Sequence, residues 1–139
     1  MIPLRFARLI WPFLFWCLGV TAATAGDATI SVTAGQDVVL ARYYEVRQAE
    51  CLALQVPRVN ITTAPQLGRA TVVRVQHETV AVGGRCGTMA VPVVQVHYRA
   101  RQPGTDSLAW EVRYQARGAA PAQATAQVRV LPPARPAPP

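Results

Sequence analysis

Few side chains in this sequence could carry out chemistry. Beyond the first 25 residues the chain has two serines, Ser31 and Ser107, and two histidines, His77 and His97. Nucleophilic catalysis needs a serine, threonine or cysteine beside a base that an acid orients, and no such trio is indicated here. His97 could share a strand face with Glu111, but such a pair is usually a simple cross-strand contact. We therefore expect no catalytic residues.

The histidines and cysteines also lack the spacing of a metal site. His77 and His97 have no third ligand at a suitable distance along the chain, and neither Cys51 nor Cys86 has a close cysteine or histidine neighbour. A redox pair would normally show two cysteines separated by two residues. We expect no metal ion and no cofactor.

The first 25 residues predict a signal peptide. Arg5 and Arg8 precede an uncharged apolar run, which ends in Ala23-Thr24-Ala25, a typical cleavage site before Gly26. An uncleaved membrane anchor is the alternative, because the uncharged stretch just reaches a spanning length. We expect a periplasmic or secreted protein with no stable membrane insertion after cleavage.

Export makes the two remaining cysteines informative. An oxidising compartment favours pairing of Cys51 with Cys86. The bridge would close a loop of about 35 residues, for which the chain-entropy model gives about 3.8 kcal/mol of stabilisation. It would also tether the glycine-rich loop at 83–87.

The basic charge of the chain comes entirely from arginine. There are 14 basic residues and seven acidic ones, which gives a formal net charge of +7. We expect Arg99, Arg113 and Arg129 to point outward on a solvated sheet face. The alternative is that they form one stripe that binds a protein or an envelope polysaccharide, because arginine makes bidentate contacts with carboxylates and phosphates. Export and the lack of interleaved exposed aromatic residues argue against nucleic acid.

Alternation of apolar and polar residues predicts strands throughout the chain after residue 27, and no window has the period of an amphipathic helix. The expected strands are 28–33, 38–46, 58–62, 69–75, 78–82, 94–99, 108–115 and 124–130, with 51–56 as a short strand or an irregular link. Seven to nine short strands with one apolar face predict an all-β protein, an Ig-like antiparallel β-sandwich. Tyr98 and Trp110 are its expected core anchors.

The chain therefore divides into three parts. Residues 1–25 form the signal peptide, and residues 26–131 form the sandwich domain. Residues 132–139 are rich in proline and predict a flexible, extended tail.

The C-terminal half resembles bacterial Ig-like and cadherin-like modules, whose pattern reads V-x-Y-x-P…G-x-D-x-F-x-Y-x-V…A-x-V-x-V. The matching residues are Val96, Tyr98, Gly104, Asp106, Leu108, Trp110, Val112, Ala126, Val128 and Val130. The segment 65–68 also looks like the turn that precedes a strand in this family. The resemblance covers residues 59–131 and implies a structural turn at Gly104 and Asp106, with Asp106 accepting hydrogen bonds from the backbone amides of that turn. Calcium-binding cadherin repeats carry clustered acidic residues at domain junctions, whereas the acidic residues of this sequence are scattered, so we do not expect a calcium site.

Two functions fit these features. The first is an exported, non-enzymatic Ig-like binding or structural module of the bacterial cell envelope. The second is an exported accessory or inhibitor-like protein that binds an acidic partner through the arginine face or an exposed strand edge. An enzyme would need a pocket that brings His97 together with an acid and a nucleophile.

Overall fold

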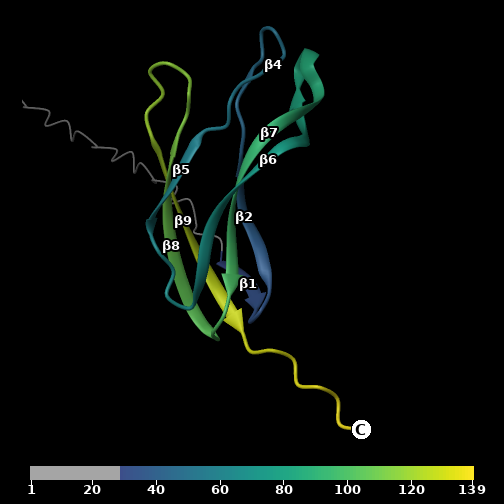
Figure 1. The fold of residues 1–139 in the computed structure, drawn as a ribbon, viewed down its shortest axis with the longest axis vertical. Coiled ribbons are helices and arrows are strands. Elements are labelled where there is room, and N and C mark those ends of the chain that lie inside the picture. The colour runs from purple at the N-terminus through teal and green to yellow at the C-terminus, as the bar shows by residue number, and fades with distance from the viewer. Residues whose placement is uncertain (1–28) are drawn as a thin grey trace, which may run out of the picture.

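Nine strands provide nearly all the regular structure in this computed structural model, which describes residues 29–139 (Figure 1). They are β1 Thr29–Thr33, β2 Asp37–Tyr43, β3 Val46–Arg47, β4 Leu52–Ala53, β5 Arg58–Thr63, β6 Gly68–Gly83, β7 Gly87–Ala100, β8 Gly104–Arg113 and β9 Ala122–Leu131. A single 3-10 turn, η1 Gly84–Cys86, joins β6 to β7. The expected signal peptide, residues 1–25, lies outside the described residues.

The strands form two large sheets and one small hairpin. One sheet has the order β1-β9-β8-β5, the other has the order β2-β7-β6, and β3 pairs only with β4. This is an Ig-like sandwich with β1 in the sheet of β9 rather than in the sheet of β2. The predicted all-β sandwich is confirmed, with one exception to its antiparallel pairing, because β1 runs parallel to β9.

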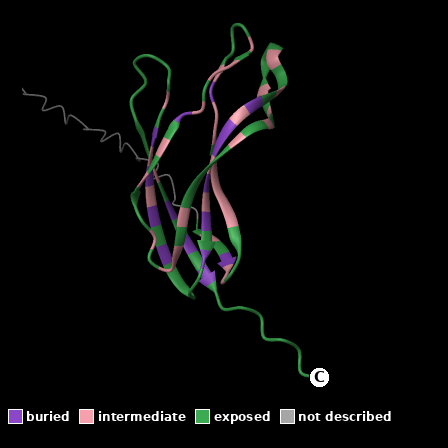
Figure 2. Ribbon diagram, in the orientation of Figure 1, coloured by how far each residue is buried: buried purple, intermediate pink, exposed green. Residues whose placement is uncertain are grey.

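The core lies between the inner faces of the two sheets (Figure 2). Every second residue is buried from Asp106 to Val112 in β8 and from Ala126 to Val130 in β9, as the alternating pattern predicts. Tyr98 is fully buried and Trp110 is 3% exposed. The indole Nε1 of Trp110 donates a hydrogen bond of 2.8 Å to the hydroxyl of Tyr43 on the opposite sheet. The two largest expected anchors therefore lie in the shared core.

The longest hairpin differs from the prediction. The expected strands 69–75 and 78–82 are one strand, β6, with a bulge between Val75 and Glu78. Its partner β7 begins at Gly87 rather than at residue 94. The two strands stay paired on both sides of the bulge, and this cross-strand pairing, which a single strand's pattern does not report, sets their length.

A disulfide joins the tip of this hairpin to the turn between β3 and β4. The sulfur atoms of Cys51 and Cys86 are 2.11 Å apart and the Cα atoms 5.2 Å apart. Arg85 adds a hydrogen bond of 3.0 Å from its guanidinium to the carbonyl oxygen of Ala49. Both segments lie at the end of the sandwich that is uppermost in Figure 1. The bridge therefore fixes two hairpin tips to each other, outside the main core.

Replacing both Cys51 and Cys86 by alanine is expected to lower the free energy of unfolding by about 2 kcal/mol, within the usual range for a native disulfide. The loss stays below the chain-entropy value because the two hairpin tips also gain freedom in the folded state. Denaturant unfolding of the variant and of the oxidised parent measures the difference. A loss of both sheets at 25 °C, seen by circular dichroism, would contradict a role confined to the hairpin tips.

The C-terminal residues 132–139 contain no strand and are exposed throughout. Within residues 29–139, no helix has the length and the apolar character needed to cross a membrane.

Candidate functional site

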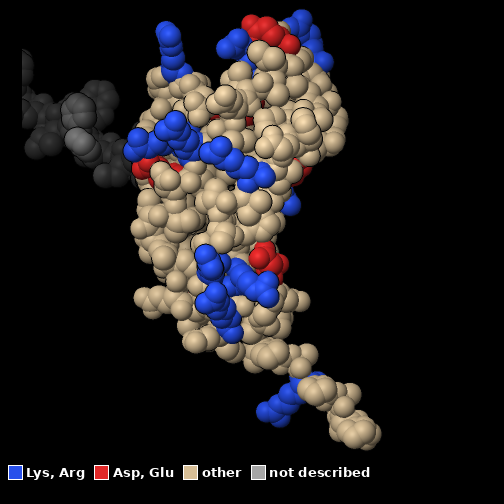
Figure 3. Space-filling view, viewed as in Figure 1, with Lys and Arg blue, Asp and Glu red and all other residues tan. Residues whose placement is uncertain are grey.

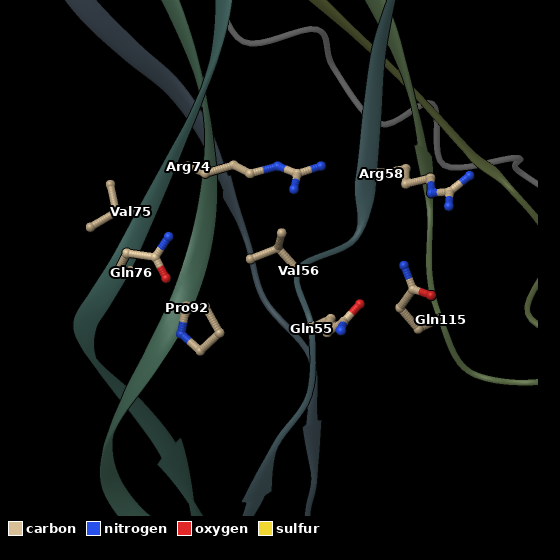
Figure 4. Close-up of a pocket in the computed structure, with 8 residues that line it drawn as sticks. All are labelled: Gln55, Val56, Arg58, Arg74, Val75, Gln76, Pro92 and Gln115. Atoms are coloured by element: carbon tan, nitrogen blue, oxygen red, sulfur yellow. The ribbon is translucent and has the colours of Figure 1, made fainter.

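A groove of about 390 Å³ opens between the two sheets, on the side where β5 and β6 are the edge strands (Figure 4). Two arginines, three glutamine side chains and three apolar residues line it: Arg58, Arg74, Gln55, Gln76, Gln115, Val56, Val75 and Pro92. No acidic side chain, nucleophile or histidine is among these lining residues. The groove therefore offers hydrogen-bond donors and positive charge to an anionic group.

The two arginines reach the groove from different sheets. Arg58 is the first residue of β5 and shares the outer face of its sheet with Arg113, so it lines the rim of the groove, and in Figure 4 its guanidinium points away from Arg74. Arg74 has the same strand parity as Ala70, which packs against the core, so it projects toward the other sheet instead of away from it. Figure 4 shows the Arg74 side chain extending from β6 toward the side of the groove that carries Arg58. The groove therefore forms only because β5 and β6, the edge strands of the two sheets, lie on the same side of the sandwich.

Glu45 holds the segments that complete the groove. Glu45 is 9% exposed. Its carboxylate accepts hydrogen bonds of 2.8 and 3.0 Å from the backbone N–H of Gln115 and one of 3.2 Å from that of Ala116. Its backbone oxygen accepts a bond of 3.0 Å from the N–H of Leu54, next to Gln55. One residue therefore positions both loops that carry glutamine side chains into the groove.

Every acidic side chain in residues 29–139 is either buried or part of an ion pair. Two of them, Glu45 and Asp106, are buried, and the other four form ion pairs. These pairs are Arg42–Glu78, Arg47–Glu50, His97–Asp37 and Arg113–Glu111. Within residues 29–139, neither Arg58 nor Arg74 forms an ion pair. Arg58 also lies directly opposite Arg113 across the β5–β8 pair, where like charges are unfavourable.

The alternative of one arginine stripe is wrong. Arg99 lies on the outer face of β7, whereas Arg113 and Arg129 lie on β8 and β9 in the other sheet. Arg113 and Arg129 also fall at opposite ends of the β8–β9 pair. Figure 3 shows basic side chains in separate groups rather than in one band. The strand pattern indicated outward positions correctly, but it could not report that β7 and β8, although consecutive, belong to different sheets.

His97 does not meet Glu111, because β7 and β8 are not paired. Its Nδ1 atom instead lies 2.9 Å from Oδ1 of Asp37, and its Nε2 atom lies 2.8 Å from Oε1 of Gln95. All three side chains stand on the outer face of the β2-β7-β6 sheet, away from the groove. In residues 29–139 no three histidine, cysteine or acidic side chains are grouped as metal ligands would be.

Asp106 does accept hydrogen bonds from backbone amides, but chiefly from a different turn. The N–H groups of Gln66 and Leu67, in the β5–β6 loop, donate to its two oxygens at 2.9 and 2.8 Å, and that of Ser107 donates at 3.0 Å. The hydroxyl of Tyr98 donates to Oδ2 at 2.7 Å. Asp106 therefore ties three segments together. We call Tyr98, Asp106, Gln66, Leu67 and Gly68 the carboxylate cluster.

Gly104 begins β8 with a φ of +137°, a conformation that glycine tolerates and L side chains rarely adopt. A Cβ at this position would also lie 2.8 Å from Cδ1 of Leu67. The turn before β8 therefore needs glycine for its backbone and for the close approach of the β5–β6 loop.

Sequence reasoning missed three residues of the groove region: Arg58, Arg74 and Glu45. Arg74 had a signal, because it is a charged residue at an apolar position of an alternating segment, which edge strands often contain. Arg58 directly follows a proline at the start of an edge strand. Glu45 gave no local signal, since its partners lie about 70 residues further along the chain.

No protein-family model matches the chain, and no curated protein matches it in sequence. Among solved structures, the chain is similar to the solution structure of amebosin, with 15% sequence identity over 74% of this chain and 88% of that one and a TM-score of 0.44. At this level the likeness supports no argument about this chain. The resemblance to cadherin-like modules remains a prediction.

Proposed function

We propose that this chain is an exported, non-enzymatic β-sandwich module of the cell envelope that binds an anionic group of a protein or a polysaccharide in the groove between β5 and β6. One observation carries the proposal: Arg58 and Arg74 line a groove without an acidic lining residue, and neither forms an ion pair within residues 29–139. Guanidinium groups suit carboxylates and phosphates because their N–H donors match two oxygens at once.

Export is supported by two independent features. The sequence of residues 1–25 has the charged, apolar and small-residue parts of a signal peptide. The disulfide between Cys51 and Cys86 suits an oxidising compartment. A mature chain that begins at Gly26, read by mass spectrometry of protein purified from the periplasm or the medium, is the expected outcome. A mature chain that retains residues 1–25 would contradict it.

A binding role suits the groove better than catalysis. Its lining provides cationic and amide groups that hold a ligand, but no side chain there acts as a nucleophile or as a general acid or base near neutral pH. We do not propose binding of an acidic partner through Arg99, Arg113 and Arg129, because these three arginines lie on two different sheets.

Replacing Arg58 or Arg74 by glutamine is expected to weaken binding of a small dicarboxylate such as glutarate about tenfold each, because each change removes a charge-assisted hydrogen-bond donor. The double variant should lose binding altogether. Nuclear magnetic resonance titration measures it, with the side-chain amides of Gln55 and Gln115 as reporters. Inorganic phosphate serves as the second probe.

Arg129→Gln is the matched control, since it removes the same charge from β9, a strand that does not line the groove. It should change the dissociation constant less than twofold. If the double variant binds both probes as well as the parent does, the groove is not an anion site and the proposed function is wrong.

A further inference from the structure

β6 leaves one of its two long sides without a partner strand. Within residues 29–139 it pairs only with β7. From Gly68 to Val75 its ladder is continuous, each residue facing one residue of β7, and the bulge begins only after Val75. This regular run is about 26 Å long at about 3.3 Å per residue. It presents free backbone donors and acceptors to another extended chain.

The same run leads directly into the groove. Arg74, Val75 and Gln76 belong to β6 and line the groove. A chain extended along the free side of β6 would therefore reach the groove at one end. β5, the edge of the other sheet, is much shorter and covers only Arg58–Thr63. The geometry thus favours β6 as the edge that a ligand of the groove would follow.

Side chains along this run combine charge with apolar surface. Val72 and Val73 are 38% and 39% exposed and lie at the middle of the run. Arg69 and Arg74 flank them, and both arginines are exposed and form no ion pair within residues 29–139. Arg69 also lies opposite Arg99 on β7, which concentrates positive charge at the start of the run. An occupant that satisfies this edge needs acidic residues on both sides of an apolar centre.

We propose that the partner is an extended acidic peptide segment of a protein, which adds as a strand to β6 between Gly68 and Val75 and places one carboxylate beside Arg74, in the groove whose rim carries Arg58. This inference rests on the proposed function and specifies the class of its ligand. Backbone pairing provides part of the affinity, and the pattern of side chains provides the selectivity. The ligand carries two adjacent apolar residues, opposite Val72 and Val73, with acidic residues before and after them.

The charges also exclude the simplest competitor, a second copy of this chain. Edge-to-edge pairing of two β6 strands would bring Arg69 and Arg74 of one copy close to the arginines of the other. Like charges across a strand pair are unfavourable, and charged side chains on edges commonly prevent self-association. The same arginines favour an acidic partner and disfavour a basic copy.

The test uses the purified full mature protein and a short peptide with two adjacent valines flanked on both sides by glutamates. In an added antiparallel strand, alternate residues direct their backbone groups toward β6, and the others direct theirs away. Two N-methylated versions of the peptide block these two sets separately. Calorimetry at low salt should show that one version binds more than about tenfold more weakly, whereas the other stays within about twofold of the parent peptide.

Each alternative gives a different result. Equal behaviour of the two N-methylated peptides would mean that charge alone binds the ligand, and the strand-addition proposal would be wrong. Stronger binding of an acidic polysaccharide, displaced by glutarate, would overturn the peptide as the partner class but leave the groove intact. Concentration-dependent dimers in sedimentation would assign the edge to a second copy. If Arg58→Gln/Arg74→Gln affects neither glutarate nor the peptide, the proposed function fails as well.

Discussion

Replacing Gly68 by alanine is expected to lower the free energy of unfolding by about 4 kcal/mol, far more than a glycine-to-alanine change usually costs. An alanine Cβ would lie 2.4 Å from the carbonyl oxygen of Arg99 and 2.6 and 2.7 Å from Cζ and the hydroxyl of Tyr98. The carbonyl belongs to the backbone of β7, and the phenol is fixed by its bond to Asp106. Overpacking of about 1–3 kcal/mol adds to the loss of a charge-assisted hydrogen bond of about 1.5–3 kcal/mol.

Gly118→Ala provides the comparison for Gly68→Ala. Gly118 has a φ of +76° and no atom within 4 Å of the added Cβ, so alanine there costs only backbone strain, about 1 kcal/mol. Denaturant unfolding of both variants gives the two values. If Gly68→Ala is no more destabilising than Gly118→Ala, then the backbone of β7 and the side chain of Tyr98 shift at little cost, and the carboxylate cluster is not rigid.

The strands that could be predicted from sequence are those with one buried and one exposed face. β8 and β9 alternate almost perfectly, and their predicted positions differ from the observed ones by only a few residues. The first half of β7 alternates out of phase with the second half, because Val91 and Val93 are buried in the first and Val94, Val96 and Tyr98 in the second. The change of phase at residues 93–94 interrupts the period of two, so the pattern that begins at residue 94 does not extend back to the start of the strand.

Pairing between strands was beyond the reach of the sequence pattern. Alternation tells which side chains share a face of one strand, but not which strand lies beside it. Arg99 and Arg113 illustrate this limit, since each points outward as expected and yet they lie on different sheets. The groove depends on the same missing information, because Arg58 and Arg74 line one groove only when β5 and β6 are the edges of two facing sheets.

The carboxylate cluster shows how a single side chain can join segments that the sequence separates. Asp106 accepts four hydrogen bonds, three from backbone amides and one from Tyr98. Burial by itself raises the pKa of this carboxyl group, but the hydrogen bonds from Gln66, Tyr98, Leu67 and Ser107 outweigh burial and hold its pKa below the ordinary value. The folded state therefore favours the charged form of Asp106.

The pH dependence of stability follows from this lowered pKa. In the unfolded chain Asp106 takes up a proton near its ordinary pKa of 3.8, whereas in the folded chain it does so only at lower pH. The stability that Asp106 contributes is therefore complete above about pH 5 and is lost as the pH falls through 3.8 toward the folded pKa. Tyr98 limits stability at high pH. Burial, together with the hydrogen bond to Asp106 and the charge of Asp106, raises its pKa, so the stability that Tyr98 contributes is lost as the pH rises above 10.

Asp106→Asn is expected to lower the free energy of unfolding at pH 7 by about 4 kcal/mol, because either orientation of the amide turns its NH₂ group toward a backbone N–H and leaves buried donors unsatisfied. The parent and the variant should approach each other in stability between pH 5 and pH 2, since only the parent loses the contribution of this carboxylate. Denaturant unfolding across that range measures both effects. Glu50→Gln, which removes an exposed carboxylate 3.8 Å from Arg47, should cost less than about 0.5 kcal/mol. If the difference in the free energy of unfolding between the parent and Asp106→Asn stays constant down to pH 2, the charge of Asp106 does not stabilise the β5–β6 loop. The packing of its side chain would then explain the loss.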